Sequence, residues 1–435
     1  MNVLVLTEEV WNDKIYPGNV MTNWLSGFSG TLANLYLASG EPDNLCCSRY
    51  FQITDRMALK SLITRKGTGK WLITRRFGTA NHYPELKGKK LHLKGDKTRG
   101  YKPLKAVLGG PLRLCRDQVW LRSDFKGSLL MDFLEDFRPE VIFSLRFYSR
   151  RMLYMERLLH SVTGAPVIVF TGDDEYSLRQ LNISPFYWCR KLLFRKDLRK
   201  TAPVYAKYLT LSERQSRQME EELGVSAGVL RKGGSFEEYR EKPAAGPIRI
   251  VYAGRLYCNR KKTLAAIAKA LSLINRNEVL MTLEIYTKEK LTQKERKQLH
   301  DERSVFLKSF VSPESLEEIY QAADVALLAE SFDLKNKLLT KYSFSTKIVD
   351  CLASSCAVLA VGPYENEGIR YLKKNKAAIC IGSPENIYPV LSRLAGHRDK
   401  IELYRRRAWE LGRKEHQEEK IRGELEEVLK EAVKE

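Results

Sequence analysis

The residues best suited to chemistry form one polar stretch near the middle of the C-terminal half, Ser343-Phe344-Ser345-Thr346-Lys347-Ile348-Val349-Asp350. Ser343 or Ser345 is a suitable N-cap for a helix that begins there. Free backbone amides at such a helix start, two hydroxyl groups and the Lys347 ammonium would together hold a phosphate group. Ser343, Thr346 and Asp350 would share one helix face, with Asp350 ~6 Å along the axis from Thr346. A carboxylate there could accept hydrogen bonds from a ribose. The alternative is a capped helix whose polar face is merely exposed.

A second cluster follows a predicted strand at Ile248–Tyr252. The strand leads into Gly254, and Arg255, Arg260 and Lys261 follow in a predicted loop before a helix near Thr263. Paired cations at the carboxyl edge of a strand suit a diphosphate, and they would stabilise the negative charge that grows on it as a leaving group. Basic loops are common, so this cluster gains weight from the Ser-Thr-Lys stretch that follows it in the same half.

Both clusters resemble those of the retaining family 4 glycosyltransferases, which have two Rossmann-like domains (the GT-B fold). Gly254-Arg255 with Lys261 matches the "GR…K" loop, and residues 343–353 are similar to the "SFSTKI" variant found in bacterial polysaccharide and capsule glycosyltransferases. The resemblance implies a nucleotide-sugar donor on the C-terminal domain, and it places Gly18 and Asn19 in an acceptor-side loop. It also places Tyr342 where these enzymes carry a glutamate that contacts the donor sugar, unless Glu330 or Asp333 supplies that carboxylate.

A run of three acidic residues begins at Asp173, directly after the predicted strand Val167–Phe170. In the family, a His-Asp pair stands here at the reaction centre, so Asp173 or Asp174 would orient the acceptor hydroxyl or stabilise an oxocarbenium-like transition state. The alternative is a helix N-cap with acidic residues at the favourable end of the helix dipole. No Asp-x-Asp motif is present, and the cations suit the diphosphate, so we expect no metal. The nucleotide sugar would be a substrate, and no cofactor is expected.

The net charge of +21 indicates an anionic partner, and most of the surplus lies before residue 247. Residues 65–105 are rich in lysine and arginine with interspersed aromatics. Residues 186–196 mix aromatic, aliphatic and basic residues at helical spacing, either for an anionic membrane surface or for packing in the core, and Arg150-Arg151 nearby favour the membrane. The acceptor would then be a glycan, either free or linked to a polyprenyl diphosphate. A non-catalytic nucleic-acid-binding protein is the competing interpretation, disfavoured because no known nucleic-acid module is present. An inverting or phosphorylase-like relative also stays open.

The elements that must position these residues alternate between short apolar runs and segments of helical length, which is typical of a doubly wound α/β protein. The strands are predicted at Val3–Leu6, Val141–Leu145, Val167–Phe170, Ile248–Tyr252, Leu283–Tyr286, Val325–Leu328 and Ala357–Val361. A polar, proline-containing segment near Pro243 predicts an N-terminal domain over 1–243 and a C-terminal domain over 244–410. A C-terminal helix over 411–435 would return to the N-terminal domain. Neither a leader peptide nor a membrane span is expected, which predicts a cytoplasmic protein, peripheral on the inner face of the membrane.

Overall fold

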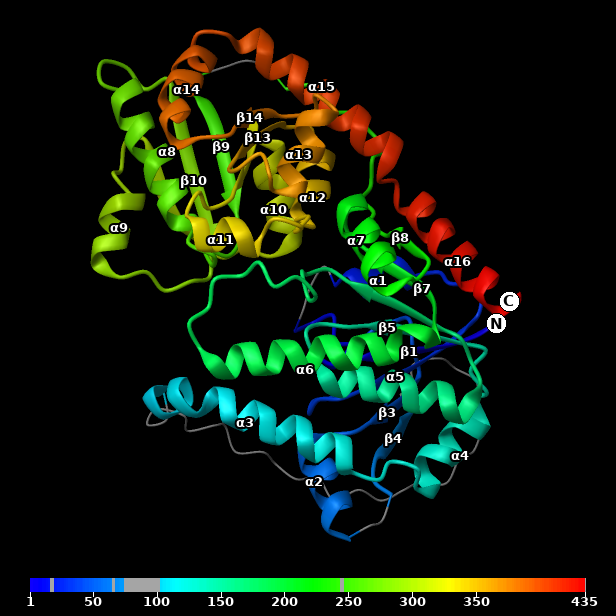
Figure 1. Ribbon diagram of the computed structural model, residues 1–435. Coiled ribbons are helices and arrows are strands. Elements are labelled where there is room, and N and C mark those ends of the chain that lie inside the picture. The colour runs from blue at the N-terminus through cyan, green and yellow to red at the C-terminus, as the bar shows by residue number, and fades with distance from the viewer. Residues whose placement is uncertain (16–18, 65–66, 74–101, 243–245, 435) are drawn as a thin grey trace.

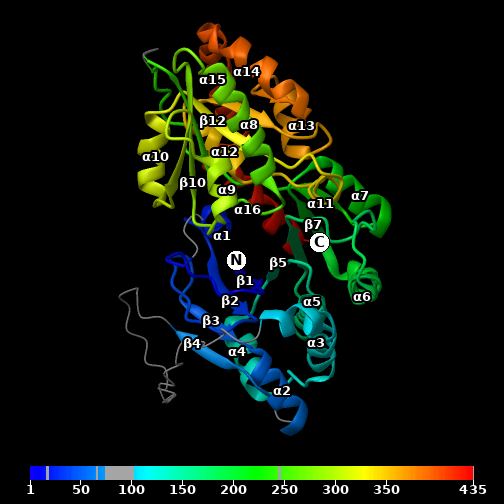
Figure 2. The same cartoon turned by 90° about the vertical axis from the view of Figure 1, so that its left-hand side faces the viewer.

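The computed structural model describes residues 1–15, 19–64, 67–73, 102–242 and 246–434. These residues form two α/β domains, and each domain has one sheet with helices on both faces (Figure 1). The view in Figure 2 shows the same two domains one above the other, with α7 (Glu213–Leu223) of the N-terminal domain close to the C-terminal domain. The basic segment at residues 65–105 lies largely outside the described residues, and so does Gly18.

The N-terminal domain is built on an eight-stranded sheet with the order β4-β3-β2-β1-β5-β6-β7-β8. Neighbouring strands are parallel, except that β4 pairs antiparallel with β3 at one edge. The strands are β1 Asn2–Thr7, β2 Thr31–Tyr36, β3 Arg49–Gln52, β4 Lys70–Ile73, β5 Val141–Leu145, β6 Val167–Thr171, β7 Tyr205–Thr210 and β8 Ala227–Val229. The helices are α1 Val20–Leu25, α2 Asp55–Thr64, α3 Lys102–Arg122, α4 Ser128–Phe137, α5 Arg150–Thr163, α6 Pro185–Thr201 and α7 Glu213–Leu223.

The C-terminal domain has a six-stranded, all-parallel sheet with the order β11-β10-β9-β12-β13-β14. This is the Rossmann order, in which the first strand lies between the second and the fourth. The strands are β9 Ile248–Ala253, β10 Met281–Thr287, β11 Val305–Ser309, β12 Val325–Ala329, β13 Ala357–Val361 and β14 Ile379–Ile381. The helices are α8 Arg260–Ile274, α9 Gln293–Leu299, α10 Pro313–Gln321, α11 Leu334–Leu339, α12 Lys347–Ala353, α13 Glu367–Lys374, α14 Ile387–Ala395, α15 Arg398–Glu415 and α16 Glu418–Lys434.

The apolar runs form strands because both faces of each sheet are covered. In β1, Val3 and Val5 are buried on one face, and Leu4 and Leu6 are buried on the other. All seven predicted strands are confirmed, and β5 and β13 have the predicted bounds. The α/β class with two Rossmann-like sheets is therefore confirmed.

The chain crosses between the domains twice. It leaves the N-terminal domain after β8 and enters the second sheet at Ile248, and it returns between α15 and α16, which packs on α1, β5 and β7 (Figure 1). The two crossings are hydrogen-bonded to each other: the Gly234 amide donates to the His416 carbonyl at 2.8 Å, and the Glu418 amide donates to the Gly234 carbonyl at 3.2 Å. A side chain at Gly233 would collide with Glu418, since a Cβ there would lie 2.6 Å from the Glu418 Cα.

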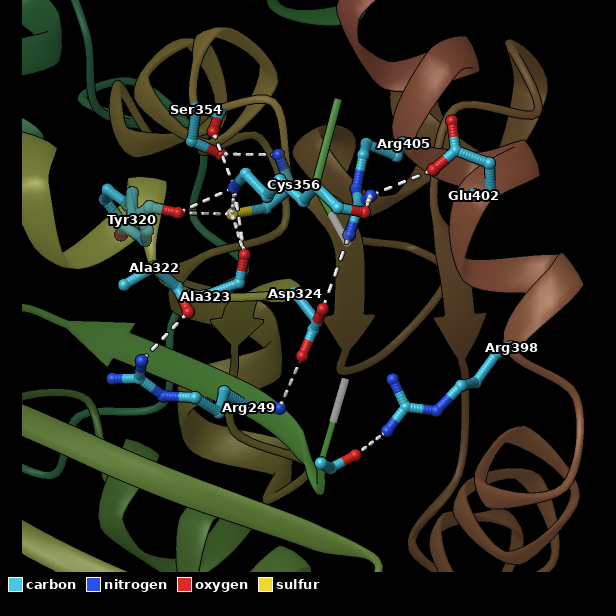
Figure 3. Close-up of polar contacts among 12 residues, drawn as sticks. Arg249, Tyr320, Ala322, Ala323, Asp324, Ser354, Cys356, Arg398, Glu402 and Arg405 are labelled. Carbon is cyan, nitrogen blue, oxygen red and sulfur yellow. Dashed lines mark hydrogen bonds and ion pairs between the residues drawn. The ribbon is translucent and has the colours of Figure 1, made fainter. Parts of the chain in front are cut away.

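The end of the first crossing is fixed to the C-terminal domain by buried polar contacts. The Lys242 ammonium donates to the carbonyls of Tyr320 and Ala323 at 2.7 and 2.9 Å. Figure 3 shows Arg405 of α15 between Glu402 and Asp324, and the Asp324 carboxylate also accepts from the Arg249 amide at 2.9 Å. Through these contacts, α15 and the start of β9 are held together at the base of the second sheet.

Candidate functional site

The site is built around Gly254, which directly follows β9 at the carboxyl edge of the second sheet. Its φ of +147° is a conformation that L side chains rarely adopt, and a Cβ at this position would lie 1.6 Å from the Nζ atom of Lys347. Glycine is therefore needed for the backbone conformation and also for the passage of the lysine side chain. The two clusters that the sequence analysis singled out meet at this contact.

Lys347 is the first residue of α12, and its side chain is partly buried. Its ammonium lies 5.2 Å from the centre of the Tyr252 ring. Among the described residues, no carboxylate forms an ion pair with it. Burial, followed by the nearby Arg260, lowers the pKa of Lys347 to about 8. A cation desolvated in this way, with no counterion, would be stabilised by an anionic ligand.

The N-cap of the helix lies one residue after the predicted cap at Ser345 and three residues after the one at Ser343. Thr346, not Ser343 or Ser345, occupies the N-cap position of α12, and its side chain makes no capping hydrogen bond. The Ser343 amide donates to the Thr340 carbonyl at 3.0 Å, so Ser343 belongs to a preceding turn and does not share a helix face with Asp350. Ser345 and Thr346 remain beside Lys347, with their hydroxyl groups in no hydrogen bond to the described residues.

Of the three cations predicted after β9, Arg255 alone is unpaired among the described residues. Arg260 is the first residue of α8 and not a loop residue, and its guanidinium is buried in an ion pair with Glu330 at 2.6 Å. Lys261 forms an ion pair with Glu295 of α9. The predicted loop of free cations is thus wrong, because α8 begins at Arg260 and carboxylates neutralise its first two side chains. Arg255 is exposed in the loop.

The carboxylates expected near the donor are engaged elsewhere in this structure. Asp350 is half exposed and pairs with Lys232 of the N-terminal domain at 2.5 Å. Glu330 pairs with Arg260, and Asp333 caps α11. The carboxylate of Asp333 also accepts from the Asn259 side chain at 3.0 Å.

Tyr342 itself is buried at the contact between the domains. Its hydroxyl accepts a hydrogen bond from Arg179 at 3.4 Å, and the Arg214 guanidinium lies 5.3 Å from its ring centre. Both arginines belong to the N-terminal domain. Tyr342 therefore joins the loop after β6 and helix α7 to the stretch that leads to Lys347.

The two aspartates that follow β6 differ in their surroundings. Asp174 is buried and stabilises its own turn by accepting from the Ser177 amide at 2.9 Å. The alternative of a helix N-cap is wrong, because no helix begins between the end of β6 at Thr171 and the start of α6 at Pro185. Asp173 is accessible to water, and burial by the surrounding protein and then repulsion from Asp174 raise its pKa. Burial raises the pKa of Cys258 in the loop after β9, and the charge of Asp173 adds to this effect, so Asp173 lies near this loop of the C-terminal domain.

The loop containing the aspartates is anchored by a buried charge network. Arg146, at the end of β5, pairs with Glu175 at 3.0 Å and with Glu156 at 3.1 Å. Its guanidinium also donates to the hydroxyls of Tyr205 and Tyr208, at 2.5 and 2.6 Å. This network fixes Glu175, and so positions Asp173 and Asp174 next to it.

A cavity of about 500 Å³ lies between the carboxyl edges of the two sheets. The N-terminal domain lines it with Glu8 after β1 and Phe147 after β5, and the C-terminal domain lines it with Arg255, Lys288 and Phe310, which follow β9, β10 and β11. In each sheet the strand order reverses beside the first strand, which is where open α/β sheets bind ligands. The cavity lies at this point of the N-terminal sheet, between β1 and β5, and on the other side it lies along β9, β10 and β11, next to the reversal between β9 and β12.

On the N-terminal side, Asn19 lines the same cavity and also caps α1, since its side chain accepts from the Met21 amide at 3.1 Å. Gly18, its predicted companion in the acceptor-side loop, lies outside the described residues. The sequence analysis missed Phe147, Lys288, Phe310 and Lys232. The first three directly follow or nearly follow strands, so strand ends were the signal that could have identified them.

The predicted membrane-contacting segment forms α6, whose inner face is buried through Lys191, Phe194 and Leu198. On the other side Leu192 is exposed by 55% and Phe186 by 45%. Arg150 and Arg151 do not extend this surface: both are buried, and they pair with Asp197 and with Glu8 and Asp55. Within the described ranges no helix is long and apolar enough to span a membrane, and no cluster of His, Cys, Asp and Glu could hold a metal ion.

Comparisons with known proteins agree with this geometry. Residues 247–396 match the sequence model of the family "Glycosyl transferases group 1". No curated protein sequence matches the chain. Among solved structures, the Anabaena protein HepE in complex with UDP is similar over 99% of this chain and 100% of its own, with a TM-score of 0.60 and 11% identity. A sucrose-phosphate synthase from Thermosynechococcus elongatus is similar over 99% of each chain, with a TM-score of 0.62 and 10% identity.

A third similar structure is the Escherichia coli trehalose-6-phosphate protein bound with UDP-2-fluoro glucose. It has a TM-score of 0.58 and 11% identity, over 98% of this chain and 99% of its own. At such low identity these likenesses concern the fold. The chain has the GT-B fold of two facing Rossmann-like domains, and its second domain carries the sequence pattern of group 1 glycosyltransferases.

Proposed function

We propose that the protein transfers a sugar from a nucleoside diphosphate donor, bound by the C-terminal domain, to an acceptor bound by the N-terminal domain. The observation that carries this proposal is the ammonium of the partly buried Lys347, which pairs with no carboxylate of the described residues and lies against Gly254 at the carboxyl edge of β9. The match of residues 247–396 to the group 1 family and the UDP complexes of HepE support it.

In this proposal the donor diphosphate lies between Lys347 and Arg255, with the hydroxyls of Ser345 and Thr346 beside it. Two cations close to a diphosphate stabilise the negative charge that develops as the sugar leaves. Arg260 and Lys261 are neutralised by carboxylates, so they would support the site and not contact the diphosphate. Because these cations neutralise the leaving group, we infer that the reaction requires no metal ion.

The ribose would be bound by Asp350 in this proposal. Its carboxylate is exposed at the start of α12 and is held by Lys232 in this structure. Lys232 would have to share the carboxylate with the ribose hydroxyls or release it. Tyr342 would lie near the donor sugar, where its hydroxyl, held by Arg179, offers a neutral contact in place of a carboxylate.

Asp173 is the carboxylate that we propose acts at the reaction centre. It is accessible, it lies near the loop after β9 of the C-terminal domain, and its pKa is raised by burial and by Asp174. It would orient the acceptor hydroxyl or stabilise an oxocarbenium-like transition state, with retention of configuration as the family resemblance implies. Asp174 would stabilise the conformation of the turn.

The acceptor would occupy the cavity between Phe147, Phe310 and Asn19. We propose that the acceptor is a glycan, either free or linked to a polyprenyl diphosphate. The reaction would belong to the synthesis of a cell-surface polysaccharide such as a capsule. The outer side of α6 would contact an anionic membrane surface through Phe186 and Leu192, with Lys196 and Lys200 exposed nearby. Sedimentation with anionic and neutral vesicles tests this contact, which Leu192→Glu should weaken.

Calorimetric titration with UDP and GDP tests the donor site. We expect one nucleotide to bind and Lys347→Met to abolish this binding. Lys262→Met is the matched control, because Lys262 is an exposed α8 cation that forms no ion pair with the described residues. Equal binding by the Lys347→Met variant, or no binding of either nucleotide by folded wild-type protein, would contradict the proposal.

A further inference from the structure

A second cavity, of about 460 Å³, lies between the domains beside the place where the chain crosses back. The N-terminal domain lines it with Arg214 and Arg217 of α7 and with Arg231 after β8. The C-terminal domain lines it with Arg370 and Lys374 of α13. This pocket shares no lining residue with the cavity at Arg255, and the proposed donor site does not account for it.

The cations of this pocket outnumber its carboxylates. Five arginine and lysine side chains line it, against the three glutamates Glu213, Glu367 and Glu415. A single carboxylate, that of Glu367, serves both Arg214 at 3.4 Å and Arg370 at 3.5 Å. The other three cations form no ion pair with any described residue.

Arg231 is held in a fixed orientation at the base of the pocket. Its guanidinium carbon lies 4.9 Å from the centre of the Phe344 ring and 4.6 Å from that of Tyr371, and its Nε donates to the Leu211 carbonyl at 3.3 Å. These contacts reduce the conformational entropy that the side chain would lose on binding a ligand. A planar guanidinium with free N–H groups matches the oxygen atoms of a phosphate group.

The surroundings add to the positive potential. Lys341 lies close to Arg214 and Arg179, and burial, followed by these two arginines, lowers its pKa. Like charges drawn together across a domain contact repel one another, and a bound anion would relieve this repulsion. The size of the pocket falls within the ~300–1,000 Å³ that is usual for small-molecule sites.

We propose that this pocket binds a small phosphorylated molecule, with its phosphate group between Arg217, Arg231 and Lys374. The bound ligand would join α7 of one domain to α13 of the other, and so stabilise the present arrangement of the domains. It would also contact Phe344, three residues before Lys347, which gives the ligand a route to influence the donor site.

Hydrogen exchange and calorimetry with inorganic pyrophosphate test the proposal on the full chain. The test variant is Arg217→Glu/Lys374→Glu, because both side chains are exposed and form no ion pair with described residues, so the fold should tolerate the change. The matched control is Lys262→Glu/Lys269→Glu, which reverses two exposed, unpaired α8 cations. Lys347→Met removes the contribution of the donor site.

We expect pyrophosphate to slow exchange in residues 213–223 and 367–374 of the wild type, the Lys347→Met variant and the control. In the pocket variant this protection should be lost and the affinity should fall at least about tenfold. Equal protection in the pocket variant and the control would overturn the proposal. So would protection that only anionic vesicles produce, because the site would then belong to a membrane surface. These outcomes do not depend on whether UDP or GDP binds to the proposed donor site.

Discussion

Gly254→Ala should weaken nucleotide binding, an effect that can be measured apart from its effect on the stability of the fold. The new Cβ would lie 1.6 Å from the Lys347 Nζ, whereas non-bonded atoms need ~3.5 Å, so the ammonium must move by about 2 Å. A hydrogen bond to a charged group contributes about 1.5–3 kcal/mol, so its loss should weaken nucleotide binding by about ten- to a hundredfold. The positive φ adds about 1–3 kcal/mol of strain to the folded state.

Calorimetry with UDP and GDP measures the first effect, and thermal unfolding measures the second. Gly164→Ala is the control for strain alone, because Gly164 also has a positive φ, +72°, while its Cβ would meet nothing within 4 Å. It should lower stability and leave nucleotide affinity unchanged. Nucleotide binding of wild-type strength in Gly254→Ala would refute the placement of the diphosphate beside Lys347.

Other predictions concern pH, catalysis and metal ions. Burial lowers the pKa of Lys347 to about 8 and a bound diphosphate should raise it. Between about pH 7 and 8, above the ~6 pKa of a phosphate group, calorimetry should find a constant nucleotide affinity, which falls by up to about tenfold per pH unit above pH 8. His416 is buried with its pKa lowered from 6.5 to about 4, so its contribution to stability is complete above pH 6.5 and decreases as the pH falls toward 4. Urea unfolding should detect a loss of up to about 3 kcal/mol over that range, absent in His416→Gln. Asp173→Asn should lower kcat by about a hundredfold or more, measured as nucleotide release, with unchanged nucleotide affinity. Activity assayed with and without EDTA should be equal, and a loss with EDTA would contradict the metal-free proposal.

The sequence predicted the framework of the fold because buried parallel strands are apolar on both faces. Runs such as Val141–Leu145 and Ala357–Val361 are visible without any structure. The sequence analysis placed Gly254 and Lys347 in two clusters of one domain, but it did not predict that they touch. Their contact depends on β9 and α12, which are far apart in the chain.

Ion pairs were the part that the sequence could not supply. Arg260, Lys261 and Asp350 were predicted as ligand-binding groups by residue type, whereas the structure pairs them with Glu330, Glu295 and Lys232. Each partner lies at least 34 residues away in the chain, so local spacing carried no signal. The Ser343 and Ser345 caps were wrong because the turn at Thr340 delays the helix, a tertiary effect that capping preference does not include.

The hydrogen bonds that join Gly234 to residues 416–418 have a mechanical consequence. Two connections held side by side act as one pivot, so the domains can rotate about it more easily than they can slide or separate. Displacement in a rotation grows with distance from the pivot. The Lys232–Asp350 pair, two residues from Gly234, would then move little. The rim at Lys288 and Phe310, which follow β10 and β11 at the far edge of the sheet, would move most. A spectroscopic distance between labels on these two sides of the molecule should report that gradient directly.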